Sequence, residues 1–251
     1  MNEYENKSIN LDSTTLSFIN EKYFIVDYLD RYLNYYENHK DLSYKEIVAR
    51  INSNLDYEFY TSLKATNIED GKLMLVNKYY YLDKNFEGDN LVNVEPNYGV
   101  GMLNKEAYEA FKRMSNDARN EGLYILSRSP YRSYGTQYSI YNNYKNTRGL
   151  AWADSWSARP GHSEHQTGYA LDVKSYTSDS LDSFGYTKEY AWMQNNAHKY
   201  GFILRYPSGK EFITGYNFEN WHYRYVGVDA ATIIVTENIT FEEYYAYYVK
   251  K

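Results

Sequence analysis

The spacing of apolar residues changes near residue 70, and this change limits the folds open to the chain. Over residues 15–38, apolar and tyrosine side chains recur mostly three and four positions apart, which predicts helix. From Lys72 onward, short apolar runs typical of strands replace this spacing. We therefore expect a helical N-terminal extension over residues 1–70 and a separate domain over residues 71–251.

The second part mixes short predicted strands with capped helices. Thr240 with Glu243, like Ser43 with Glu46 in the extension, forms a capping-box pattern that starts a helix. The predicted strands cover residues 73–76, 123–127, 168–173, 202–204 and 222–225, and the predicted helices cover 104–120, 133–144, 188–200 and 241–249. This order favours an α+β fold.

Composition excludes several classes of protein. With 27 basic and 33 acidic side chains the net charge is −6, and the basic residues are dispersed, so we expect no nucleic-acid partner. The chain has no cysteine, which removes disulfides, thiol nucleophiles and cysteine-bound zinc. No window approaches the roughly 18 apolar residues of a membrane span, so we expect no span in these residues.

Two of the five histidines have carboxylates at suggestive spacings. His165 follows a turn and precedes Asp172, which shares one face of the predicted strand with the small Ala170. Glu219 precedes His222 by three residues at the start of another predicted strand. The remaining histidines are His39, His162 and His198, of which we interpret His162 as a turn residue and His198 as a packing or hydrogen-bonding residue.

These residues could together form a catalytic metal site. Zinc in such sites takes three nitrogen or oxygen ligands from the protein, a set that His165, Asp172 and His222 would supply without cysteine. Glu219 would then accept the proton of a zinc-activated water as it attacks a carbonyl group. Spacing alone leaves open the alternative that these are separate hydrogen-bonded polar residues.

The ordered motif resembles a known family. Ser163-x-His165-x-x-Gly168-x-Ala170-x-Asp172, followed by Glu219-x-x-His222, resembles the signature of VanY-type D-alanyl-D-alanine carboxypeptidases. Further stretches that resemble the family include Tyr131-Arg132-Ser133 with Gln137, Ser157 to Gly161, His198 to Pro207, and Thr214-Gly215, so that the resemblance covers residues 72–228. It implies a small antiparallel sheet flanked by helices, as in the zinc peptidases that share the hedgehog fold.

The resemblance also implies a role for each matching residue. His165, Asp172 and His222 would hold one zinc ion per chain, and Glu219 would be the catalytic base. Arg132 would polarise the scissile carbonyl and stabilise the oxyanion.

Three other positions match substrate contacts of the family. Gln137 and Ser163 would contact the terminal residue of the substrate, and Tyr206 would border the cleft. For Ser163 the alternative is a turn residue that caps backbone groups.

One stretch departs from the family pattern. Where the family has a compact turn with a glycine, this chain reads Ser127-Arg128-Ser129-Pro130-Tyr131-Arg132-Ser133, with additional residues and no glycine. The arginine is retained, and Arg128 adds a second cation near the expected site entrance. We therefore expect this departure to alter the approach of the arginine to the metal and, with it, substrate preference.

The sequence thus predicts a zinc carboxypeptidase that removes the terminal D-alanine from peptidoglycan stem peptides. Either D,D-cleavage of pentapeptides or L,D-cleavage of tetrapeptides fits the same metal chemistry. One alternative is a zinc-containing module that binds wall peptides without cleaving them, and another is an endopeptidase acting inside cross-bridges.

The expected location follows from the substrate. Peptidoglycan stems lie outside the cytoplasmic membrane, so we expect a membrane-anchored or secreted protein of which these residues are a trimmed piece. A cytoplasmic role on recycled wall fragments is the alternative.

Overall fold

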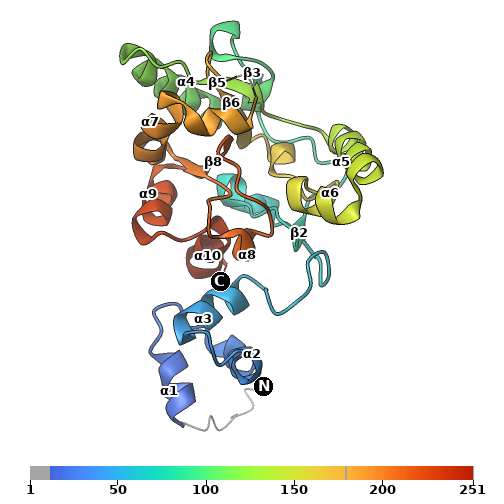
Figure 1. Ribbon diagram of the computed structural model, residues 1–251, viewed down its shortest axis with the longest axis vertical. Coiled ribbons are helices and arrows are strands. Elements are labelled where there is room, and N and C mark those ends of the chain that lie inside the picture. Colours follow the sequence, from blue (N-terminus) through green and yellow to red (C-terminus); the bar gives the residue numbers. More distant parts are fainter. Residues whose placement is uncertain (1–11, 179, 251) are drawn as a thin grey trace. The chain divides into compact units, whose positions relative to one another are not determined.

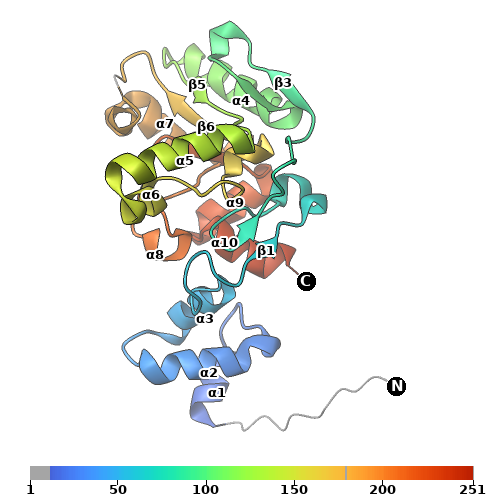
Figure 2. The same ribbon diagram turned by 90° about the vertical axis from the view of Figure 1, so that its right-hand side faces the viewer.

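The computed structural model describes residues 12–178 and 180–250, and it divides into two compact units (Figures 1 and 2). The first unit covers Met1–Glu58 and the second covers Phe59–Lys251. Residues 59–70, which the sequence pattern assigns to the extension, therefore group with the second unit.

The first unit is a small bundle of helices. It contains α1 (Ser13–Ile19), a 3₁₀ turn (Val26–Tyr28), α2 (Leu29–Asn38) and α3 (Tyr44–Asn52). Phe18 stacks on Tyr32 with 5.5 Å between ring centroids, and Ile47 and Ile51 of α3 complete the buried centre. The capping box predicted at Ser43 is present.

A continuous helical stripe over residues 15–38 is wrong, because the chain leaves the helix after Ile19 and re-enters it at Leu29. The break is held by Tyr32, whose hydroxyl accepts the backbone N–H of Ile25 at 3.2 Å and donates to Asn52 at 2.5 Å. The reversal lets aromatic residues of both helices share one core, which a single straight helix could not achieve.

The second unit contains the remaining helices and strands. The helices are α4 (Lys105–Asn120), α5 (Tyr134–Arg148), α6 (Leu150–Trp156), α7 (Lys188–Asn196), α8 (Glu211–Thr214), α9 (Val228–Glu237) and α10 (Phe241–Tyr244). The strands are β1 (Lys64–Ala65), β2 (Tyr80–Tyr81), β3 (Leu91–Asn93), β4 (Met102–Asn104), β5 (Leu126–Ser129), β6 (Ala170–Lys174), β7 (Phe202–Leu204) and β8 (His222–Tyr225).

Four of these strands form the central sheet within the described residues, in the order β5-β6-β8-β7, with every neighbouring pair antiparallel. Side chains alternate between its faces. Leu171 and Tyr223 point into the main hydrophobic core, whereas Asp172, His222 and Arg224 lie at the intervening positions and so face the opposite side. The sheet thus separates an apolar layer from a polar one.

Helices cover both layers. On the apolar side α4 packs against the sheet, with Phe111 edge-on to Phe202 at 6.4 Å between ring centroids. On the polar side, the ring of Phe241 at the start of α10 lies 5.1 Å from the guanidinium of Arg224. The hairpin of α5 and α6 lies on the opposite side of the sheet region from α7 and α9 in Figure 1. A cavity on the polar side is lined in part by residues of α5 and α6, and the site lies there.

The structure confirms some predicted elements and corrects others. Strands β7 and β8 have the predicted bounds, and α4 ends at Asn120 as predicted. The strand predicted over residues 73–76 is wrong: a 3₁₀ helix covers Ile68–Leu73, and the following apolar residues are buried without pairing to another strand. Helices α6, α8 and α9 were not predicted.

Across the described residues, no helix combines the length and the apolar character needed to cross a membrane.

Candidate active site

The three predicted ligands meet on the polar face of the sheet. His165 lies in a 3₁₀ turn (Glu164–Thr167) just before β6, Asp172 lies on β6, and His222 begins β8. Asp172 and His222 are direct cross-strand partners, so their side chains rise from the same face. The ligating atoms of all three residues lie within 4.8 Å of one another.

Gly168 brings the turn and the strand together. It ends the 3₁₀ turn in the left-handed conformation, with φ of 78°, which glycine adopts without strain. A Cβ at this position would also lie 2.6 Å from a methyl group of Leu91. The glycine of the motif is therefore required for the chain to reverse tightly between His165 and Asp172.

The distances within the group suit a shared cation. Asp172 Oδ1 lies 3.4 Å from His165 Nε2 and 3.4 Å from His222 Nδ1. In the described part of the chain, His165 Nε2 and Asp172 Oδ1 are both buried and lack a hydrogen-bond partner. Buried polar atoms are rarely left in this state, and a metal ion between them would satisfy both.

Each imidazole is held in its orientation by a contact of the ring nitrogen that faces away from the ligand group. His165 Nδ1 lies 2.7 Å from the carbonyl oxygen of Pro130, so it donates there and turns Nε2 toward Asp172. His222 Nε2 faces Glu164 Oε2 at 3.6 Å, which leaves Nδ1 for the cluster. Partners of this kind fix the tautomer of metal-binding histidines.

The charge state of the histidines follows from burial and neighbours. Burial and the nearby Arg132 lower the pKa of His165 to about 4, so its imidazole is neutral near pH 7, as metal binding requires. Burial also acts to lower the pKa of His222, but Asp172 and Glu164 outweigh it and raise this pKa to about 9. A metal ion would compete with that proton for Nδ1.

Glu219 is the carboxylate next to the ligand group. Its Oε2 lies 3.5 Å from His222 Nδ1, in the turn that precedes β8. Burial raises the pKa of Glu219 to about 7, and the negative charge of Asp172 acts in the same direction. A carboxyl group that titrates near pH 7 suits a general base.

Arg132 lies two residues before the start of α5, and its side chain extends to the ligand group. One of its terminal nitrogens lies 3.7 Å from Asp172 Oδ2, and the other donates to Gln137 Oε1 at 2.9 Å. Gln137 is itself held, since its amide donates to the carbonyl of Ala158 at 2.7 Å. The structure therefore places Gln137 as the residue that orients Arg132, in addition to its place in the cavity wall.

A cavity of about 560 Å³ opens onto these groups. Ser163 lines it, occupies the N-cap position of the turn and makes no side-chain capping bond, which is contrary to the alternative role considered above. The ring of Tyr206 packs 4.8 Å from that of His222. The wall formed by α5 and α6 is aromatic, with Trp152 lying 6.1 Å from Trp156.

The stretch that departs from the family pattern is part of the site. It carries a bulge of β5 between Ser127 and Ser129, where the pairing with β6 shifts so that Ser129 lies opposite Asp172. Arg128, at the bulge, is exposed and lines the cavity. This stretch therefore forms a bulge at the end of β5, supplies the Pro130 carbonyl that orients His165, and places Arg128 as a second cation at the cavity rim.

Other residues lie outside this site or were not anticipated. His162 is buried and its Nδ1 lies 2.7 Å from the carbonyl oxygen of Asn77, and His198 lies beside a separate pocket. Glu164 was missed by sequence reasoning, because an acidic residue at an unassigned motif position gives no signal of burial. The aromatic wall was also missed, since tryptophan near tyrosine is equally typical of core packing.

A buried His/Asp/His group with a neighbouring carboxylate, on a small antiparallel sheet between helices, defines a metallopeptidase-type hydrolase site. The family model of VanY D-alanyl-D-alanine carboxypeptidase matches residues 101–228. The chain belongs to the VanY D-alanyl-D-alanine carboxypeptidase family. This confirms the resemblance drawn from the motif and the predicted fold class.

Individual relatives agree. The putative carboxypeptidase YodJ of Bacillus subtilis is 42% identical over 181 residues, which cover 69% of this chain and 66% of YodJ. A structure of the LdcB LD-carboxypeptidase is 39% identical with a TM-score of 0.69, covering 74% of this chain and 91% of LdcB.

A VanY D,D-pentapeptidase from a VanB-type resistance cassette, solved with Zn(II), is 32% identical with a TM-score of 0.60 and covers 69% of this chain and 98% of that one. VanYB has also been solved with D-alanine-D-alanine. The zinc complex of this neighbour and the His/Asp/His group found here agree with the predicted cofactor. The chain spans about two thirds of the length of YodJ.

Proposed function

We propose that the second unit is a zinc-dependent carboxypeptidase that removes the terminal D-alanine from peptidoglycan stem peptides. The observation that carries the proposal is the convergence of His165, Asp172 and His222 beside the buried Glu219. Family membership supports the choice of reaction.

The donor set fits zinc. Two imidazole nitrogens and one carboxylate oxygen are the ligands of many catalytic zinc sites, and the cavity leaves room for a fourth ligand. When bound, zinc lowers the pKa of a water molecule and polarises the scissile carbonyl. The remaining steps fall to groups of the chain itself.

Glu219 and Arg132 would perform these steps. With a pKa raised toward neutrality, Glu219 can accept the proton of the attacking water and return it to the leaving amine. Arg132 projects into the same cavity, where its charge can stabilise the oxyanion that develops on the peptide carbonyl. Gln137 keeps that guanidinium in place.

The cavity rim suits the carboxylate end of a peptide. Arg128 and Arg132 give this side of the cavity two cations, and the side chain of Ser163 offers a hydroxyl donor. The aromatic wall of Trp152 and Trp156 would contact the part of the stem that precedes the scissile bond. Tyr206, packed on His222, would contact the terminal residue.

The test is mass spectrometry of pentapeptide and tetrapeptide stems after incubation with the zinc-loaded protein, beside a chelated sample and the Glu219→Gln variant. Loss of alanine from the pentapeptide alone establishes D,D-cleavage, and loss from the tetrapeptide alone establishes L,D-cleavage. If neither is shortened although zinc is bound, the carboxypeptidase proposal is wrong. Cross-linked fragments then distinguish an endopeptidase from a module that binds wall peptides without cleaving them.

The substrate also suggests the place of action. We propose that the protein acts outside the cytoplasmic membrane, where stem peptides lie, either anchored or secreted. Fractionation of cells that produce the protein at its natural level tests this, and activity confined to the cytoplasm would support a role on recycled wall fragments instead.

A further inference from the structure

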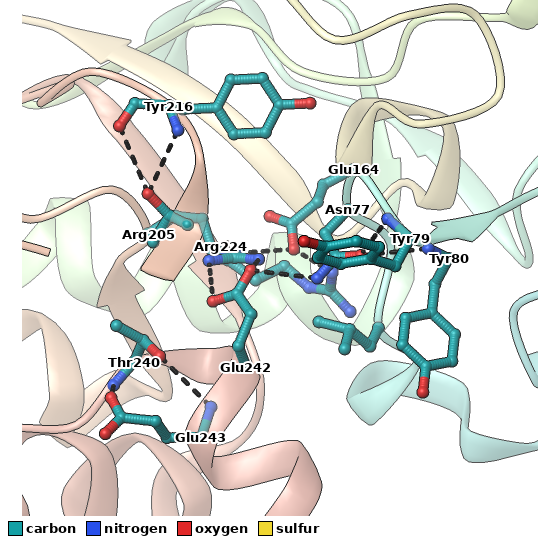
Figure 3. A network of polar contacts seen from close by, with 12 residues as sticks. Asn77, Tyr79, Tyr80, Glu164, Arg205, Tyr216, Arg224, Thr240, Glu242 and Glu243 are labelled. Carbon is teal, nitrogen blue, oxygen red and sulfur yellow. Dashed lines mark hydrogen bonds and ion pairs between the residues drawn. The ribbon is translucent and has the colours of Figure 1, made fainter. Parts of the chain in front are cut away.

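Next to His222 lies a cluster of four buried charges, which Figure 3 shows. It consists of Glu164 from the turn before β6, Arg205 just after β7, Arg224 on β8 and Glu242 on α10. Each of them is at most 2% exposed. We call these residues the charge cluster; two positive and two negative charges balance within it.

The ion pairs of the charge cluster form a continuous series. Glu242 binds Arg205 through two parallel contacts, Oε2 to one terminal nitrogen at 2.9 Å and Oε1 to the other at 2.6 Å. The Nε of Arg205 donates to Glu164 Oε1 at 2.8 Å, and Arg224 donates to the same oxygen at 3.0 Å. Figure 3 shows Arg205 between the two carboxylates.

Arg224 is fixed independently of Glu242. Its guanidinium also donates to the carbonyl oxygens of Lys72 and Met74, both at 2.9 Å, and to that of Tyr225 at 3.1 Å. Among the described hydrogen bonds, the guanidinium of Arg205 has no such backbone partners, and its terminal nitrogens donate only to Glu242, although the group also lies over the rings of Tyr206 and Phe241. The position of Arg205 therefore depends on Glu242.

The other end of this series of ion pairs lies next to His222 of the proposed metal site. Glu164 uses Oε1 for both arginines, and its Oε2 faces His222 Nε2 at 3.6 Å. Within the described residues, both of these facing atoms are buried and neither has another hydrogen-bond partner. When His222 Nδ1 carries a metal, Nε2 carries the proton and has only this carboxylate to donate to.

We propose that Glu242 on α10 is a positioning residue for the metal site, acting through Arg205 and Glu164 on the orientation of His222. The inference rests on the proposed role of His222 as a zinc ligand. Glu242 lies beyond residues 101–228, the part of the chain that the family model matches, so α10 adds this support from outside the matched domain.

The physical reason is charge balance in a dry interior. Removal of the Glu242 charge leaves two guanidinium groups and one carboxylate in the cluster, and a buried charge that loses its partner seeks another. The candidate for Arg205 is Oε2 of Glu164, because the Nε of Arg205 already binds the other oxygen of that carboxylate. Its capture would draw this oxygen away from His222, which would loosen the imidazole that holds the metal.

The matched variants are Glu242→Gln and Glu243→Gln. Glu243 is the next residue of the same helix and is also buried, but its side chain accepts the backbone N–H of Thr240 at 2.7 Å in the capping box and makes no contact with Arg205. Both variants remove one buried negative charge from α10. Only Glu242→Gln should change the metal site.

The measurement is zinc affinity in competition with a chromophoric chelator. Glu164→Gln should weaken binding about 10- to 100-fold, as loss of a carboxylate behind a ligating histidine does. Glu242→Gln should weaken it by about 10-fold, at the lower end of that range, and Glu243→Gln should leave it unchanged. In the Glu164→Gln background, Glu242→Gln should add nothing, because the connecting group is already gone.

The outcomes separate this inference from the proposed function. Wild-type zinc affinity in Glu242→Gln, or an equal loss in both backgrounds, overturns the positioning role. A wild-type protein that does not bind zinc overturns the proposed function itself. If Glu242→Gln does not fold, as its circular dichroism would show, Glu242→Asp is measured instead: its shorter side chain cannot keep both contacts to Arg205, so weaker zinc binding supports the positioning role and wild-type affinity overturns it.

Discussion

Replacement of Glu219 by glutamine should make the metal-free protein more stable above neutral pH. Burial raises the pKa of Glu219 from 4.5 to about 7, so the folded chain holds this proton more tightly than the unfolded chain does. The stabilisation from this group is complete below the unfolded value of 4.5 and is lost as the pH rises through 7. Glutamine is neutral at every pH, so the variant does not lose this stabilisation as the pH rises.

The magnitude follows from the size of the shift. A displacement from 4.5 to about 7 corresponds to about 3 kcal/mol, at about 1.4 kcal/mol for each unit. Wild type and variant should therefore differ little at pH 5, and the variant should be more stable by up to about 3 kcal/mol at pH 8. Most of the difference should develop between these values.

The assay is urea unfolding in the presence of a chelator, followed by the fluorescence of the four tryptophans. The free energy of unfolding is compared between wild type and variant at each pH, so that titrating groups distant from Glu219 contribute equally to both. The same variant should lose about 10²- to 10⁴-fold in kcat when loaded with zinc. A variant that is no more stable than wild type at pH 8, or equally more stable at pH 5, would refute the reasoning.

Three further changes test other parts of the site. Arg132→Lys should lower kcat/KM on stem peptides about 10²- to 10³-fold with zinc content unchanged, and steady-state kinetics at unaltered kcat/KM would exclude an oxyanion role. Trp156→Ala should raise KM several-fold with little change in kcat, whereas Tyr186→Ala, at an exposed position away from the cavity, should change neither. Gly99→Ala should lower the free energy of unfolding by more than about 1 kcal/mol, because the added Cβ would overlap the backbone of Ser127 on β5. The control is Gly122→Ala, which is also at positive φ but has open space around it. Equal losses in the two variants would show that only the backbone angle matters.

The sequence predicted those elements whose ends are set locally. Helix α4 and strands β7 and β8 were found because capping residues, glycines and short apolar runs act over a few residues. Residues 73–76 are equally apolar, but they are buried by distant parts of the chain, so their apolar character gave no indication of conformation. The break between α1 and α2 was missed because the same spacing of aromatic residues suits one long helix or two packed ones.

The candidate site divides in the same way. The approach of His165, Asp172 and His222 could be anticipated because each lies in a short motif that resembles the family signature, and in the structure the pairing of β6 with β8 brings the two motifs together. The charge cluster could not, since its hydrogen-bonded pairs are 37 to 60 residues apart along the chain and each charged side chain alone is typical of a solvated surface. Burial of a charge depends on its partners, and a single sequence does not state which distant residues these are.

The charge cluster and the ligand group differ in how their charges are balanced. The charge cluster is neutral by itself, with Glu164 and Glu242 matched to two arginines. In the ligand group, Asp172 and Glu219 are two buried acids whose mutual repulsion contributes to the raised pKa of Glu219, and without a metal Arg132 and the proton of His222 offset their charge. A divalent cation held by His165, Asp172 and His222 would displace that proton and add positive charge beside both acids. The ionised Glu219 therefore opposes folding in the absence of the metal, and saturating zinc should raise the unfolding midpoint of wild type more than that of Glu219→Gln.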